Sequence, residues 1–118
     1  EDRVVFLPFM SQEELAQQFG QCDAVVDQFN VGSMGMIATQ AMACGRPVFA
    51  WIDSKAYARC FGEVPPVFNC RTSGEVASAL AQMADKKAYA RAGAALRRWV
   101  GRFHAARNVV APFLKAFR

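Results

Sequence analysis

Residues 24–52 read AVVDQFNVGSMGMIATQAMACGRPVFAWI, and the pattern of this stretch decides the fold. It opens with an apolar run, residues 24–29, which predicts a buried strand. A glycine-containing turn follows at residues 30–35. Residues 36–44 favour a helix, and Gly45 stands where a left-handed C-terminal cap is needed. Because strand character returns after Gly45, the stretch predicts a strand, a helix and a second strand, the repeating unit of a parallel sheet.

The other strands are expected at short apolar runs outside this central helix. Residues 46–52 form the second strand of the central unit, with proline tolerated near its start. Residues 3–8 and residues 64–70 are further apolar runs that contain proline. The sequence therefore predicts an α/β fold with a Rossmann-like parallel sheet of about four strands and helices on both faces.

Two capping boxes mark where flanking helices begin. Ser11 stands three residues before Glu14, and Thr72 stands three residues before Glu75. Residues 53–64 show no clean period, so no element is expected there. Apolar residues at helical spacing predict three further helical segments, carried by Val76, Leu80 and Met83, then by Tyr89, Leu96, Trp99, Val100 and Phe103, and finally by Val109, Val110, Phe113, Leu114 and Phe117.

Composition places the chain among small globular proteins. It has 118 residues, of which 53% are hydrophobic and 20% charged, which excludes a disordered or fibrous chain and predicts a single domain, residues 1–118. No apolar run approaches a membrane span, and the first residues do not resemble an export signal, so we expect a soluble, cytoplasmic protein. The cysteines lack zinc-site spacing and His104 is the single histidine, so no metal site and reduced thiols are expected.

Charge is distributed unevenly along the chain. Residues 1–85 hold ten acidic and five basic residues, whereas residues 86–118 hold nine basic residues and no acidic one. Two interpretations of the basic block, residues 86–118, stay open. One is a binding module for nucleic acid or for an anionic membrane at its inner face, and the other is amphipathic helices whose aromatic side lies in the core. The second is favoured because the aromatic residues recur at helical spacing. They do not form the aromatic platform of a single-strand binder, so no nucleic-acid partner is expected.

One motif is specific. Residues 41–48 read AMACGRPV, with Gly35 upstream. This run resembles the donor-site signature of group 1 glycosyltransferases of the GT-B fold, in which E-G-x-G is followed by four residues and then by E-A-M-A-x-G-x-P-V. Residues 4–9 are similar to the family's V-x-F-L-G segment, and residues 67–118 to the end of its donor domain. The resemblance implies a partial GT-B C-terminal domain that lacks its earlier strands and the N-terminal acceptor domain.

The resemblance also implies a function. A retaining, metal-independent transferase would move a sugar from a nucleoside-diphosphate sugar to an acceptor hydroxyl, with the nucleotide sugar as substrate and no further cofactor. The family's first glutamate approaches the transferred sugar, and here that position is Gly32. The second accepts hydrogen bonds from the nucleotide ribose, and here it is Gln40, which keeps a carbonyl acceptor. Asp27 is an alternative source of a carboxylate.

Each candidate donor-binding residue has a structural alternative. The turn from Gly32 to Gly35 either cradles a diphosphate with backbone amides or simply needs glycine. Ser33 either contacts that phosphate or caps a helix. Gln40 either contacts ribose or is a helix-surface amide. Phe9 and Met10 either lie in the loop that runs past the nucleotide base in the family or pack in the core, and core packing is favoured. The full set comprises Phe9, Met10, Asp27, Gly32, Ser33, Met34, Gly35 and Gln40.

A rival hypothesis follows from the same substitutions. Because Gly32 keeps nothing of the family's first glutamate, the chain could be a degenerate GT-B domain that has lost donor chemistry and acts as a protein-interaction module. No residue is identified as catalytic, and the chain alone is expected to transfer nothing.

Overall fold

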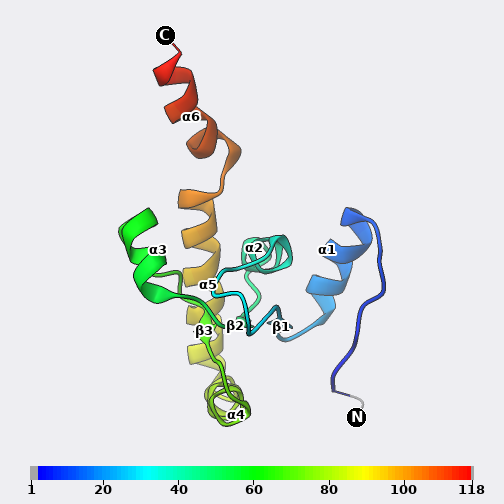
Figure 1. Ribbon diagram of the computed structural model, residues 1–118. Helices are drawn as coiled ribbons and strands as arrows, with labels where there is room; N and C mark the ends of the chain where they lie inside the picture. The colour runs from blue at the N-terminus through cyan, green and yellow to red at the C-terminus, as the bar shows by residue number, and fades with distance from the viewer. Residues whose placement is uncertain (1–2, 118) are drawn as a thin grey trace.

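The computed structural model describes residues 3–117 as an α/β structure built on a three-stranded parallel sheet (Figure 1). The order in the sheet is β1-β2-β3, and each strand lies inside a range that the sequence predicts. Residues 1–2 and 118, the ends of the predicted domain and of the basic block, lie outside the described residues. The strands are β1 (Val25–Val26), β2 (Val48–Ala50) and β3 (Phe68–Asn69), with Val25 opposite Val48 and Phe49 opposite Phe68.

Helices cover both faces of this sheet, as predicted. Figure 1 shows α2 and α5 on one side of the strands and α4 on the other, with α1 beside α2. The described helices are α1 (Gln12–Gln21), α2 (Met36–Ala43), α3 (Ser54–Phe61), α4 (Ser73–Gln82), α5 (Lys86–Phe103) and α6 (Ala106–Ala116).

Alternation along β2 divides the core into two layers. Val48 and Ala50 belong to the larger cluster, where they join buried side chains of α1, α2 and α5 such as Phe19, Met42 and Leu96. Phe49 points to the opposite face and packs in a smaller cluster that includes Ala79 of α4. Successive side chains of a strand face opposite sides. The central strand is therefore covered on both faces, which is typical of a parallel sheet.

Both predicted capping boxes are present. The Ser11 hydroxyl accepts a hydrogen bond from the Glu14 amide, and the Glu14 carboxylate accepts one from the Ser11 amide. Thr72 and Glu75 make the same reciprocal pair at the start of α4. Local spacing was sufficient to locate these two helix starts, because the partners of a cap lie within one turn.

The predicted left-handed position after α2 is also confirmed. Gly45 has a φ of 70°, and its amide donates to the Met42 carbonyl at 2.9 Å. The Arg46 amide donates to the Ala41 carbonyl at 2.9 Å, which completes a Schellman motif. This turn brings the chain directly from α2 into β2.

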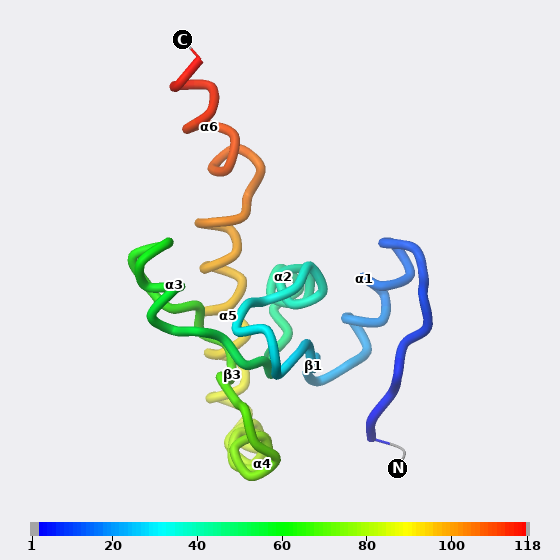
Figure 2. The backbone as a smooth tube through the Cα atoms, viewed as in Figure 1, coloured from blue at the N-terminus to red at the C-terminus, as the bar shows by residue number. Residues whose placement is uncertain are grey.

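The strand predicted at residues 3–8 is wrong. Residues 4–8 form no ladder, and Val5 and Phe6 are 74% and 92% exposed. Figures 1 and 2 show this segment running on the outer side of α1, so that the helix separates it from β1. A strand needs a neighbour to satisfy its backbone groups. Without one in the described part of the chain, the apolar run stays extended, and the sheet has three strands instead of about four.

Two helical details also differ from the prediction. Residues 53–64, for which no element is expected, contain α3, with the Asp53 carboxylate as its N-cap and Gly62 at a φ of 77° as its C-cap. Both capping residues are visible in the sequence, and Tyr57 and Phe61, one turn apart, pack against the larger core cluster, although no side chain of α3 is fully buried. In α4 the buried residue is Ala79, whereas Leu80 is 50% exposed.

The last helix leaves the body of the molecule. Figure 1 shows α6 continuing beyond the end of α5, and the molecule measures 55 × 32 × 29 Å along its principal axes. The Asn108 side-chain amide donates to the carbonyls of Gly101 and Arg102, so it binds the free end of α5 and fixes the junction. The core prediction holds for Leu96 and Trp99 of α5, but the apolar side of α6 is exposed. Within residues 3–117 no helix is long and apolar enough to span a membrane.

Candidate functional site

The candidate site is the loop between β1 and α2, at the carboxyl ends of the parallel strands. Ligands of open parallel sheets bind beyond these ends, where loops lead into helix N-termini. The loop is joined to the next strand by a bridge between Gly32 and Ile52. The Asp53 amide donates to the Gly32 carbonyl at 2.8 Å, and the Trp51 amide donates to the Gln28 carbonyl at 2.9 Å. Loop and strand end therefore form one unit.

Gln28 organises this loop from within. Its side-chain carbonyl accepts from the amides of Asn30 at 2.8 Å and Val31 at 2.7 Å. Its side-chain NH₂ donates to the carbonyls of Ser33 and Trp51. One side chain thus satisfies four backbone groups. Gln28 was not among the candidate residues, although a polar amide near the carboxyl end of the predicted strand was the available signal.

Two further side chains hold the loop amides that were predicted to cradle a diphosphate. The Asp27 carboxylate accepts from the Gly35 amide at 2.8 Å. The Tyr57 hydroxyl of α3 accepts from the Met34 amide at 2.8 Å. Both amides already have protein partners, so the structure gives Asp27 a positioning contact with the loop. Tyr57 was not among the candidate residues because α3 was not expected.

The first turn of α2 has no side-chain cap. Its N-cap is Gly35, which offers no acceptor, whereas Ser11, Asp53, Thr72 and Asp85 cap four other helices with side-chain oxygens. In the described structure, no protein acceptor is found for the Met36 and Ile37 amides. Free amides and the helix dipole favour an anion at such an end. The region open to an anion therefore begins at Met36, next to the Asp27 carboxylate.

Gly32 has little room for any side chain. Its φ is 77°, and a Cβ atom built there would lie 3.2 Å from Cζ3 of Trp51. L-residues rarely adopt this backbone conformation. The family's glutamate therefore cannot be placed at this position without a change in the local backbone and in the indole ring.

Gln40 lies on α2 beside the start of α1. Its side-chain NH₂ donates to the side-chain carbonyl of Gln12, while its own carbonyl oxygen is shielded from solvent and has no partner in the described structure. A buried acceptor without a donor is costly. Among the side chains of the predicted site residues, this oxygen is the buried polar atom without a partner in the described structure.

Phe9 and Met10 separate in the structure. Met10 packs against the larger core cluster, in agreement with the favoured interpretation. Phe9 is fully exposed, so the core prediction is wrong for this residue. Because Met10 immediately precedes the N-cap of α1, the Gln12–Gln40 hydrogen bond brings this segment next to α2.

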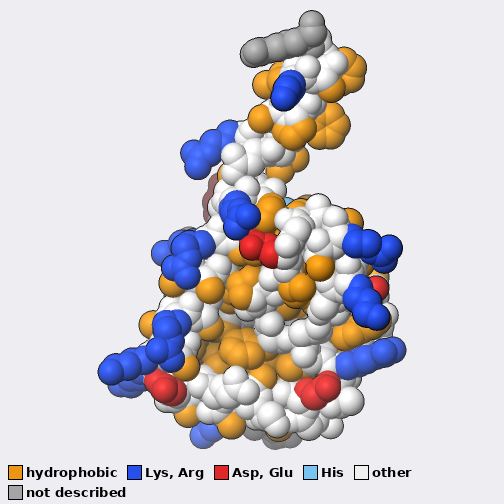
Figure 3. Space-filling view, turned by 90° about the vertical axis from the view of Figure 1, so that its left-hand side faces the viewer, with side chains coloured by type: hydrophobic (Ala, Val, Ile, Leu, Met, Phe, Trp, Pro, Cys, Tyr) orange, Lys and Arg blue, Asp and Glu red, His pale blue; other side chains and the backbone are white. Residues whose placement is uncertain are grey.

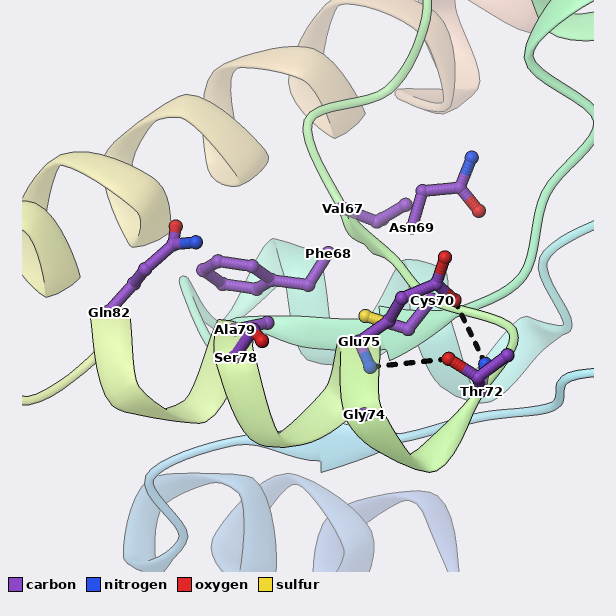
Figure 4. A pocket seen from close by; sticks show the side chains of 10 residues that line it. All are labelled: Val67, Phe68, Asn69, Cys70, Thr72, Gly74, Glu75, Ser78, Ala79 and Gln82. Carbon is purple, nitrogen blue, oxygen red and sulfur yellow. Dashed lines mark hydrogen bonds between the residues drawn. The ribbon is translucent and has the colours of Figure 1, made fainter.

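Two hollows lie near the sheet. The first, of about 600 Å³, lies between β3 and α4 and contains none of the predicted site residues (Figure 4). The second, of about 250 Å³, is mostly apolar and lies on the α3 side of the loop. It brings Gly32, Ser33 and Met34 together with Tyr57 and His104. Of the candidate residues, Gly32, Ser33 and Met34 border this second recess.

His104 and Arg46 have structural roles. His104 is the C-cap of α5, and partial burial against neighbouring aromatic rings lowers its pKa. Arg46 precedes β2, where its guanidinium donates to the Gly20 carbonyl at 3.0 Å and to the Tyr89 hydroxyl at 3.2 Å. These contacts join the end of α1 to α5 at the amino ends of the strands, away from the candidate loop.

Comparison with known proteins identifies a relationship over part of the chain. Over 49 residues it is 45% identical to D-inositol 3-phosphate glycosyltransferase of Mycobacteroides abscessus. It is 43% identical over the same length to the enzymes of that name from Mycolicibacterium vanbaalenii and Mycolicibacterium smegmatis. Each match covers 42% of this chain and 11% of the relative. No family model and no solved structure matches. The chain is related to glycosyltransferases over this short segment.

Proposed function

We propose that this chain is part of the nucleotide-sugar-binding domain of a retaining, metal-independent GT-B glycosyltransferase of group 1. The observation that carries the proposal is the uncapped N-terminus of α2, which begins at the carboxyl end of the sheet directly after the candidate loop. This is where the resemblance expects the diphosphate of the donor. Backbone amides at this position would stabilise the negative charge of the leaving phosphate.

Two other features support the proposal. The relatives matched over 49 residues carry the name of a glycosyltransferase. The unsatisfied carbonyl oxygen of Gln40 is an acceptor of the kind that a ribose hydroxyl needs. The sugar contact that the family obtains from its first glutamate has no equivalent at Gly32.

A titration of the 118-residue chain with UDP, GDP and ADP, followed by amide NMR, tests this proposal. We expect saturable shifts at Gly32, Ser33, Met36 and Ile37, with the preferred base giving the tightest binding. Unchanged spectra of a folded sample at millimolar nucleotide would contradict it and favour the interaction-module hypothesis.

A matched pair of proline variants makes the test specific to the α2 amides. Met36→Pro removes one amide N–H at the first helical position, where proline suits the backbone. Ser73→Pro makes the same change at the first position of α4. Met36→Pro should weaken nucleotide binding severalfold, and Ser73→Pro should leave it unchanged.

A second candidate function is supported by α6. Its exposed apolar residues, among them Val110, Phe113 and Leu114, follow a helical period and share one side. Arg107 and Lys115 lie outside this side. Figure 3 shows hydrophobic side chains on the surface of this projecting helix. A basic amphipathic helix of this kind binds anionic membrane surfaces, so we propose peripheral membrane contact through α6.

Sedimentation with lipid vesicles tests the second candidate. Binding to vesicles rich in phosphatidylserine should exceed binding to phosphatidylcholine vesicles, and it should weaken as salt screens the charges. Phe113→Asp should abolish it, whereas Ala111→Asp, outside the apolar side, should have a smaller effect. Equal effects of the two variants, or no binding at all, would contradict membrane contact.

A further inference from the structure

The candidate loop lacks a nearby positive charge in its own part of the sequence. From residue 4 to residue 45 the chain contains no lysine or arginine, although it contains Asp27. The Asp27 carboxylate accepts a hydrogen bond from Gly35, at the N-terminus of α2. A phosphate group that approached this end of α2 would therefore meet a negative charge. A counter-charge has to come from a loop that follows another strand.

Arg71 follows β3 and lies at the same edge of the sheet. Its guanidinium carbon is 4.3 Å from the centroid of the Trp51 ring. The side chain is exposed, and within residues 3–117 its guanidinium makes no hydrogen bond or ion pair. The backbone amide of Arg71 donates to the Glu75 carboxylate at 2.7 Å, which ties this residue to the capping box of α4. Arg71 is thus fixed at its backbone while its charged donors remain free.

Trp51 connects Arg71 to the candidate loop. The Trp51 amide and carbonyl are both bonded to Gln28, and the indole ring lies against Gly32. The guanidinium and the Gly32 backbone therefore contact the same ring. A planar guanidinium above an indole face uses its π surface for the ring and keeps its edge N–H groups for other partners. Those N–H groups have the geometry that binds a phosphate in a bidentate manner.

The acidic group that contacts Arg71 is engaged by backbone amides. The Glu75 carboxylate accepts from the amides of Arg71 and Thr72. No carboxylate neutralises the Arg71 guanidinium in the described structure.

We propose that Arg71, held above Trp51, binds a phosphate group of the ligand at the carboxyl edge of the sheet and supplies the positive charge that the β1–α2 loop lacks. This inference rests on the proposed function for the identity of the ligand, a nucleoside diphosphate or its sugar conjugate. The assignment of Arg71 as an anion-binding residue rests on its own contacts.

The experiment compares pyrophosphate with UDP, GDP and ADP in amide and indole NMR titrations of the 118-residue chain. Pyrophosphate is expected to shift the Trp51 indole N–H and the Arg71 side-chain N–H, while the buried Trp99 serves as the internal reference. Arg71→Gln should weaken binding about tenfold, because charge-assisted hydrogen bonds are lost. Arg98→Gln, which removes an exposed arginine of α5 that makes no hydrogen bond or ion pair within residues 3–117, should change it much less.

The outcomes separate the two proposals. If a nucleotide shifts the Gly32 and Met36 amides and Arg71→Gln binds it as tightly as the unaltered chain, the role of Arg71 is overturned and the donor site stands. The opposite outcome has three parts: pyrophosphate binds at Trp51, Arg71→Gln abolishes that binding, and no nucleotide shifts the loop amides. In that case Arg71 is an anion site and the proposed donor site is overturned. A Trp51→Phe variant that retains an aromatic face should keep most of the affinity. Equal losses from Arg71→Gln and Arg98→Gln would overturn the inference.

Discussion

Gly32 and Trp51 are packed so closely that a Cβ atom on Gly32 would lie 3.2 Å from Cζ3 and 3.3 Å from Cη2 of the indole. Because the φ of Gly32 is 77°, the position is restricted both by the backbone and by the ring. Replacing Gly32 with the family's glutamate is therefore a structural perturbation as well as a restoration of the signature.

We expect Gly32→Ala to lower the free energy of unfolding by about 2–3 kcal/mol, combining the cost of a left-handed backbone with crowding against Trp51. Gly62→Ala is the matched control, since Gly62 has the same φ of 77° and an added methyl group would find nothing within 4 Å. It should cost about 1–2 kcal/mol. Urea unfolding measures the stability of both variants. Equal losses of unfolding free energy would mean that the indole ring of Trp51 moves aside at no cost.

Gly93 permits α5 to approach the turn after α2. A Cβ atom on Gly93 would overlap the Gly45 carbonyl oxygen. Gly93→Ala should therefore destabilise the protein by about 2–3 kcal/mol, because neither helix backbone nor turn backbone can move locally. Gly101→Ala, in the same helix with open space around it, should stabilise by up to about 1 kcal/mol. In thermal unfolding the melting temperature should fall for Gly93→Ala and rise for Gly101→Ala. An unchanged melting temperature for Gly93→Ala would contradict the close packing.

Gln28 should prove more important for the loop than any of the predicted site residues. Gln28→Ala leaves the amides of Asn30 and Val31 without their acceptor, and we expect a loss of about 2 kcal/mol in unfolding free energy. Hydrogen exchange of these two amides should accelerate. Gln17→Ala, at an exposed position of α1 whose side chain makes no hydrogen bond in the described structure, should be nearly neutral. Unchanged protection of Asn30 and Val31 would contradict the role of Gln28.

Asp27 should oppose anion binding while it holds the loop. Asp27→Asn keeps an oxygen that can accept from the Gly35 amide and removes the negative charge beside the α2 N-terminus. We expect pyrophosphate affinity to rise severalfold and stability to fall by about 0.5–1 kcal/mol, because a charge favourable to the helix dipole is lost. Titration and urea unfolding measure the two effects. Weaker anion binding by Asp27→Asn would show that the carboxylate assists the ligand.

Acid should loosen the two capping boxes. Hydrogen bonds from backbone amides lower the pKa of Glu14 and of Glu75 below the ordinary value of 4.5. A carboxyl group whose folded pKa is lowered stabilises the fold fully above its unfolded pKa, and this contribution is lost as the pH falls through the folded pKa. The urea concentration at the unfolding midpoint should therefore fall as the pH is lowered from about 5 to about 3, the range in which carboxyl groups titrate. Glu75→Gln should reduce the drop, whereas Glu13→Gln, without a capping bond, should not.

The sequence predicted the local features of this protein correctly. Both capping boxes, the left-handed Gly45 and the strand, helix and strand around α2 are present. These features depend on residues within one turn of each other. The exception is α3, whose caps and whose apolar pair Tyr57 and Phe61 are visible in the sequence but were not recognised as a helix.

The apolar runs at the two ends show the limit of this reasoning. Residues 4–8 have the composition of a buried strand, and α6 has the apolar side of a core helix, yet both are exposed in the described structure. Composition and period identify a surface that can be buried. They do not say whether a partner strand or helix lies beside it.

Local sequence patterns were enough to predict the types of the central elements, their caps and the position of a glycine-rich turn at the end of a strand. Three contacts became visible in the folded molecule alone: Gln28 organises this turn, Trp51 fills the space beside Gly32, and Arg71 from a distant loop lies against the same indole ring. The physical reason is range: caps and helical periods act between neighbours in the chain, whereas these contacts join loops that meet because parallel strands end at the same edge.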